Sequence, residues 1–139
     1  MTVGTRPPSR AHTVIAVAAL AWNLVGLMMF VLRVAMQPAQ VAALSPADRS
    51  VYHATPPWVL AAFGVAVLAG VAGSLGLLAR RRWAVPAFAV SLVALLLQVA
   101  GTYVVTPAWS AYGAAGLGMP IVLIVVGVLL LRQARRTTA

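Results

Sequence analysis

The chain has 139 residues, of which 63% are hydrophobic and only 8% are charged, and its mean hydropathy is +0.99. An ordinary soluble domain carries about 25% charged residues, so this composition excludes a water-soluble fold, a disordered chain and a disulfide scaffold. It predicts an integral membrane protein. Cysteine is absent, which excludes thiol redox chemistry and cysteine-ligated metals.

The net charge of +9 comes from ten arginines and a single acid, Asp48. A pI near 12 would suit a nucleic-acid-binding protein. However, eight of the arginines flank apolar runs and form no stripe on a soluble face. We therefore expect no nucleic-acid partner.

Four apolar runs are each long enough to cross a bilayer, which needs about 20 helical residues. They are predicted at about residues 13–35, 57–79, 84–105 and 112–131, within a single transmembrane domain covering residues 1–139. The first run is longer than the apolar core of a signal peptide, so we expect it to be retained. Tight connections between the later runs favour an all-α four-helix up-down bundle.

The direction of threading follows from the arginines. The N-terminus, the turn at residues 80–82 and the C-terminus carry eight of them, whereas the long loop on the other side holds Asp48 and Arg49, which cancel. Positive charge stays on the cytoplasmic side, so residues 1–12 and 132–139 are predicted as cytoplasmic tails. Asp48 could pair with either Arg33 or Arg49.

The first external loop carries a helix-start signal. Ser45, Pro46 and Asp48 have the spacing of an N-cap, a first-turn proline and a capping acid. This spacing predicts a short surface helix from Pro46 to about His53.

Polar residues inside two spans invite an explanation, because they are costly in lipid. The first span contains Trp22, Asn23 and Arg33, and the third contains Ser91, Gln98 and Thr102. With 100° of rotation per residue, the residues of each span fall on one face of its helix. We expect a polar seam between the first and third spans, either dry or wet, with Arg33 and Tyr103 at its outer mouth. Packing alone would also explain Asn23, and a snorkelling anchor would explain Arg33.

Two further clusters are predicted to be structural. The second span presents a stripe of small residues that lets helix backbones approach closely, and the stripe consists of Ala66, Gly70, Gly73 and Ser74. This stripe suits packing within the bundle or self-association. The turn after it is predicted to anchor in anionic lipid head groups, and its residues are Arg80, Arg81, Arg82 and Trp83.

The sequence does not contain a recognisable set of catalytic residues. His12 and His53 lie at predicted membrane boundaries, and no span contains a carboxylate. No metal site, cofactor site or nucleophile–base–acid set is predicted, so we expect no enzyme. A carrier that uses a membrane-embedded acid is also disfavoured.

Several short motifs occur in a familiar order. They are Trp22-Asn23-Leu24-Val25-Gly26, Pro57-Trp58-Val59, Leu77-Leu78, Arg81-Arg82-Trp83-Ala84-Val85-Pro86 and Met119-Pro120-Ile121. In this order the chain resembles, from Thr13 to Arg132, a family of small bacterial four-span proteins, mostly uncharacterised, some labelled "sugar transporter". The resemblance implies a multi-pass protein of the bacterial inner membrane and no catalytic residue.

Two functional hypotheses follow. In the first, the protein binds or passes a small polar solute through the seam between the first and third spans, and it does so as a homo-oligomer. In the second, it is a non-transporting accessory or assembly subunit that packs against a larger membrane complex.

Overall fold

The computed structural model describes residues 10–138, and within this range the chain forms helices and no strand. Four of the helices are long and apolar enough to cross a membrane, which confirms the predicted helical class. The elements in chain order are α1 (Arg10–Val34), α2 (Pro38–Ala42), α3 (Pro46–Ala54), α4 (Pro57–Leu78), α5 (Ala84–Val105), α6 (Ala108–Tyr112), the 3-10 helix η1 (Ala114–Leu117) and α7 (Gly118–Thr138).

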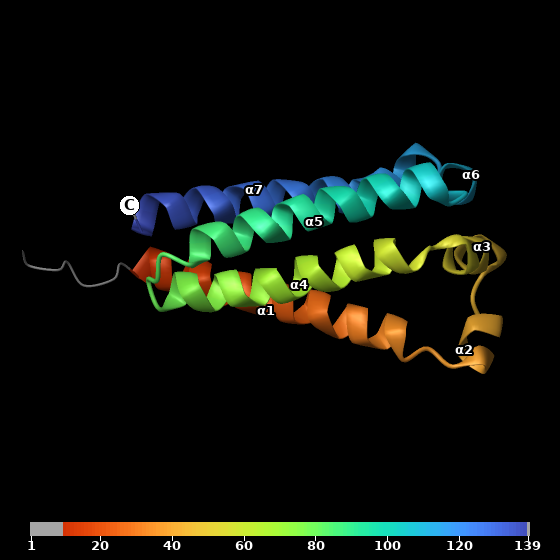
Figure 1. The fold of residues 1–139 in the computed structure, drawn as a ribbon, viewed down its shortest axis with the longest axis horizontal. Coiled ribbons are helices and arrows are strands. Elements are labelled where there is room, and N and C mark those ends of the chain that lie inside the picture. The colour runs from red at the N-terminus through yellow and green to blue at the C-terminus, as the bar shows by residue number, and fades with distance from the viewer. Residues whose placement is uncertain (1–9, 139) are drawn as a thin grey trace, which may run out of the picture.

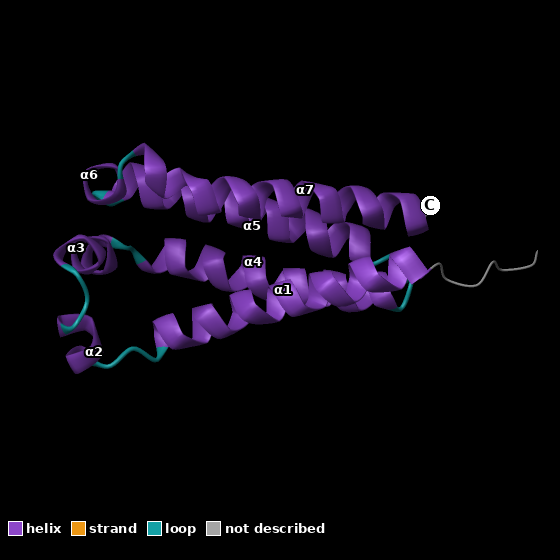
Figure 2. Cartoon of the chain, turned by 180° about the vertical axis from the view of Figure 1, so that it is seen from behind, coloured by secondary structure: helices purple, strands orange, loops and turns teal. Residues whose placement is uncertain are grey.

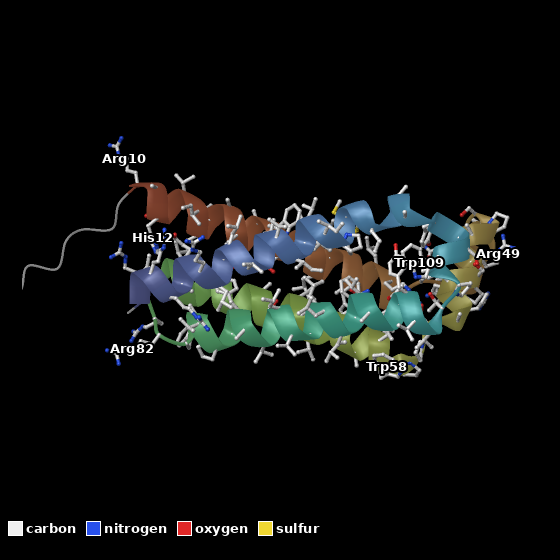
Figure 3. The ribbon with its side chains drawn as sticks, turned by 90° about the horizontal axis from the view of Figure 1, so that it is seen from above. Arg10, His12, Arg49, Trp58, Arg82 and Trp109 are labelled. Atoms are coloured by element: carbon white, nitrogen blue, oxygen red, sulfur yellow. The ribbon has the colours of Figure 1, made fainter. Side chains whose placement is uncertain are left out.

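The long helices α1, α4, α5 and α7 run side by side along one axis (Figure 1). The start of α1, the α4–α5 turn and the end of α7 gather at one end, which we call the terminal end. The short helices α2, α3 and α6 gather at the other, which we call the loop end. Arg10, His12 and Arg82 lie at the terminal end, whereas Arg49, Trp58 and Trp109 lie at the loop end (Figure 3).

The long helices pack in the order α1, α4, α5, α7. Extensive contacts join α1 to α4, α4 to α5 and α5 to α7, whereas α1 and α5 do not form an extensive pair. The first and third spans therefore do not form the extensive pair that a seam between them requires, because α4 packs against both. Small residues on α4 allow this central position: Gly70, Gly73 and Ser74 are all buried.

The spacing between α1 and α4 changes along their length. Around the middle of the two helices, Gly26 and Gly70 let the two backbones come close, since a Cβ on either would meet a side chain of the other helix. Nearer the loop end the rings of Phe30 and Phe63 stack edge to face at 5.4 Å. The two helices accordingly separate toward the loop end (Figure 2).

The predicted boundaries of the second and third spans agree with α4 and α5 to within one residue. The fourth apolar span covers Ala114–Thr137, close to the predicted start at about Tyr112 and longer than predicted at the other end. Its first residues form η1, and α7 begins at Gly118. Gly113 has φ +63°, a left-handed conformation that ends α6. At its other end α7 continues to Thr138, so most of the predicted tail at 132–139 is helical. Residues 10–12 of the predicted N-terminal tail belong to α1, and the rest of that tail lies outside the described residues.

The short helix predicted from Pro46 to about His53 is present as α3 (Pro46–Ala54). Ser45 is its N-cap, and the Ser45 hydroxyl accepts a hydrogen bond from the Asp48 amide at 3.1 Å. The preceding helix α2 was not predicted. Its start is held by Gln40, whose side-chain oxygen accepts from the Gln37 amide at 2.7 Å.

The α4–α5 turn ends α4 with a left-handed residue. Arg80 has φ +55°, and the Arg81 amide donates to the Gly76 carbonyl at 2.8 Å. The Arg80 amide donates to Leu77. These two bonds form a Schellman motif, in which arginine stands where glycine is usual.

Candidate functional site

Asn23 makes its polar contacts with α4 and with its own helix. Its Nδ2 donates to the Ser74 hydroxyl at 3.2 Å and to the Ala19 carbonyl at 2.9 Å. Ser74 is fully buried and donates in turn to the Gly70 carbonyl at 2.8 Å. The polar partner of Asn23 is therefore in the second span, and not in the third as expected.

The polar residues of α5 also turn toward nearby backbone. The Ser91 hydroxyl donates to the Ala66 carbonyl of α4 at 2.6 Å. Two helical turns further along, Gln98 and Thr102 bond to each other: the Thr102 hydroxyl donates to the Gln98 carbonyl at 2.8 Å. Asn23, Ser74 and Ser91, which we call the central polar cluster, thus meet around Gly70. A Cβ at Gly70 would overlap Asn23 Oδ1 and would lie 3.3 Å from Ser91 Oγ.

The small-residue stripe of α4 faces the interior of the chain. Ala66, Gly70, Gly73 and Ser74 are all buried. Gly73 lies against the ring of Phe88 on α5, where a Cβ would approach within 2.8 Å. Within one copy this face is covered, so it is not available for self-association.

Arg33 and Tyr103, the expected mouth of the seam, take separate aromatic partners. The Arg33 guanidinium lies 3.7 Å from the centre of the Tyr52 ring, and it donates to the Tyr52 carbonyl at 3.4 Å. The Tyr103 ring packs edge-on against Trp109 at 5.2 Å. The structure therefore ties α1 to α3, and α5 to α6, without bringing Arg33 and Tyr103 into one site.

Asp48 joins the two halves of the loop end. Its carboxylate accepts from the Tyr112 hydroxyl at 2.6 Å and from the Ser45 hydroxyl at 2.9 Å. These hydrogen bonds lower the pKa of Asp48 below its ordinary value, and burial opposes them. Burial first, and then the hydrogen bond to Asp48, raise the pKa of Tyr112 to about 12. Arg49 instead donates to the carbonyls of Ala42 and Leu44, so Asp48 has neither of its expected arginine partners among the described residues.

His12, which the sequence places only at a predicted membrane boundary, is a buried polar residue. It is 4% exposed, its Nε2 lies 2.9 Å from the Leu77 carbonyl, and its Nδ1 lies 3.3 Å from Nε2 of Gln133. His12 therefore links α1, α4 and α7 at the terminal end, beside the buried core of Ala16, Leu77 and Ala134. The available signal was its spacing: His12, Ala16, Ala19 and Asn23 recur on one helical face.

Trp22 lines a groove and is not a member of the central polar cluster. It is 37% exposed, and the groove lies between α1 and α7 with a volume of about 520 Å³. Apolar side chains form most of this groove, and Arg132, Gln133 and Arg136 lie at its terminal end. We call it the α1–α7 groove.

The predicted lipid anchor lies on the surface of the terminal end. Arg80, Arg81, Arg82 and Trp83 are all exposed. Trp83 also steadies the turn, because its indole nitrogen donates to the Ala72 carbonyl at 3.2 Å.

A second pocket, of about 410 Å³, lies at the loop end and is lined by Met36, Val41, Arg49, Tyr52 and His53, among others. The Nε of Arg49 is buried there without a hydrogen-bond partner. Between residues 10 and 138, no three His, Cys, Asp or Glu side chains come together. No protein family, curated protein or solved structure matches this chain.

Proposed function

We propose that this chain is a non-catalytic, four-span accessory subunit that packs against a larger complex in the membrane. The observation that carries the proposal is the internal pairing of its polar groups. Asn23 and Ser91 donate to acceptors on α1 and α4, and neither residue lines either of the pockets described above. A solute passing between the spans would have to break hydrogen bonds that have no water to replace them.

We further propose that the protein resides in a bacterial inner membrane with both termini in the cytoplasm. The support is the charge of the terminal end, where the sequence places eight arginines and no acidic side chain. Such an excess stays on the cytoplasmic side. In this orientation Arg80, Arg81 and Arg82 lie among anionic head groups and Trp83 lies at the interface.

The surface proposed for the larger partner is the side of α1 that faces away from α4. Val25, Met28 and Leu32 are each more than half exposed there, and they recur at helical spacing. Methionine adapts to irregular partner surfaces. The glycine stripe of α4 is already covered, so α1 is the better candidate for the partner face than the second span.

One observation favours the competing function, binding or passage of a small polar solute such as a sugar. The loop-end pocket presents the unpaired Nε of Arg49 beside Tyr52 and His53. A solute could bind there from the external side without entering the central polar cluster. Its passage across the membrane would still require Asn23 or Gln98 to exchange partners.

Two measurements separate these functions. A photo-crosslinker at Met28, activated in native membranes, should give a discrete, saturable adduct, whereas the same group at the equally exposed Val93 of α5 should not. Flux of labelled sugars into proteoliposomes should equal that of empty vesicles. Transport that Asn23→Leu or Gln98→Leu abolishes would overturn the accessory role, and equal crosslinking from Met28 and Val93 would remove the proposed partner face.

A further inference from the structure

We propose that the α1–α7 groove binds an anionic phospholipid, with an acyl chain along the apolar wall and the phosphate between Arg132 and Arg136. This inference rests on the membrane location proposed above. It concerns a site different from the exposed arginine turn between α4 and α5.

The ring of long helices is open between α1 and α7. These two helices touch through His12 and Gln133 at the terminal end, yet they form no extensive pair. The space beside this contact is the groove of about 520 Å³, within the range of about 300–1,000 Å³ typical of ligand sites. In a bilayer an acyl chain would fill such a space, because unfilled volume forfeits van der Waals contacts.

The groove has an apolar wall and a positively charged end, which match the acyl chain and the phosphate of a phospholipid. Its wall is made by side chains such as Ile15, Ala18 and Trp22 on α1 and Val126 and Leu129 on α7. From Ile15 to Trp22 this wall extends about 10 Å along the helix axis. Arg132 and Arg136 close only the terminal end, where the proposed orientation puts the head groups.

Charge complementarity selects an anionic occupant. Arg132 and Arg136 are four residues apart and therefore project from the same face of α7. Both are exposed, and the single acidic side chain, Asp48, belongs to the opposite end. Two guanidinium groups on one face match the phosphate oxygens of a head group. A second copy of this strongly basic chain would bring more positive charge to the same place.

Trp22 provides a direct test, because it lines the groove. A variant with Trp58, Trp83 and Trp109 replaced by Phe leaves Trp22 as the only indole. This protein is reconstituted into vesicles of phosphatidylcholine that contain either brominated phosphatidylglycerol or brominated phosphatidylcholine. We expect stronger quenching of Trp22 by the brominated anionic lipid. The added substitutions Arg132→Gln and Arg136→Gln should lower this preference about 30-fold, the loss expected for two arginine contacts at an anionic surface.

The matched control is Arg10→Gln with Arg135→Gln, which removes the same charge from the same end without changing the groove lining. It should keep most of the preference. Equal loss in both double variants would mean diffuse attraction only and would overturn the proposal, as would equal quenching by the two lipids. Absence of quenching in inserted protein would mean that protein covers the groove, which also overturns it. A protein that fails to float with the vesicles would overturn the membrane location as well.

Discussion

At the scale of single residues, Gly70 decides how closely three helices approach. Asn23 of α1 and Ser91 of α5 both contact it, and the Asn23 amide is fixed by its bonds to Ala19 and Ser74. Glycine is unfavourable inside a helix by roughly 0.5–1 kcal/mol relative to alanine. Here that cost is offset by close packing and by the hydrogen bond that the short distance permits.

Gly70→Ala should lower the free energy of unfolding by about 1–3 kcal/mol, the usual cost of overpacking a well-filled interior. The reason is that the new Cβ would overlap Asn23 Oδ1. Denaturant titration in detergent micelles, followed by circular dichroism, measures the change. Gly118→Ala is the control, since a Cβ there meets nothing within 4 Å. Equal stability of the two variants would contradict the packing described for Gly70.

At the scale of elements, α3 and α6 are joined by Asp48 and Tyr112, which are far apart in sequence. The pKa of Tyr112 is raised to about 12, so its protonated form is favoured in the folded state. Its contribution to stability is present below the ordinary tyrosine pKa of about 10 and is lost as pH rises toward 12. The pKa of Asp48 is lowered, so its contribution is present at neutral pH and is lost in acid as the carboxylate becomes protonated.

Tyrosinate absorbance, taken as the difference between wild type and Tyr112→Phe, should therefore show Tyr112 ionising near pH 12. Asp48→Asn should move this midpoint downward, because the variant removes the negative charge that opposes tyrosinate formation. The midpoint should stay above the ordinary tyrosine value, since burial, the larger cause, remains. A Tyr112 midpoint near 10 in both proteins would show that α3 and α6 are not joined in this way.

The sequence predicted some elements better than others for identifiable reasons. Pro57 and the arginine turn mark the ends of α4 and α5, and Ser45 marks the start of α3, so these boundaries are close. The separate 3-10 helix η1 at the start of the fourth span was not predicted, because the segment around Gly113 and Gly116 is as apolar as the helix that follows it. Hydropathy gives the length of an apolar segment. It does not show where the helix within that segment is interrupted, which here depends on the positive φ of Gly113.

At the scale of the whole molecule, helical periodicity gives the face of a residue and does not give the neighbouring helix. Periodicity placed Asn23 with Trp22 and Arg33 on one face of α1, and Ser91 with Gln98 and Thr102 on one face of α5. Their partners were wrong because the order of packing depends on which span can be central. The small residues of α4 make it the central one, with α1 and α5 packed against it. The α1–α7 groove follows from the same order, and no local pattern reveals an open side of a bundle.

The distribution of charge between the two ends predicts how the helices are oriented across the membrane. Eight arginines belong to the terminal end or its flanking sequence, whereas the loop end carries two arginines, Arg33 and Arg49, together with Asp48. Because the chain contains no cysteine, single cysteines can report on each end without background. Ser50 on α3 and Ala79 beside the α4–α5 turn are both exposed, and neither substitution removes an arginine.

A membrane-impermeant maleimide should label Ser50→Cys in intact bacterial cells, and it should label Ala79→Cys only after the membrane is opened. The physical reason is that arginines adjoining the spans are retained on the cytoplasmic side during insertion, which leaves α3 outside. Labelling of both proteins in opened membranes serves as the control for thiol reactivity. Labelling of Ala79→Cys alone in intact cells would mean the opposite orientation. Comparable labelling of both in intact cells would mean that the chain inserts in two directions, which the arginine asymmetry should prevent.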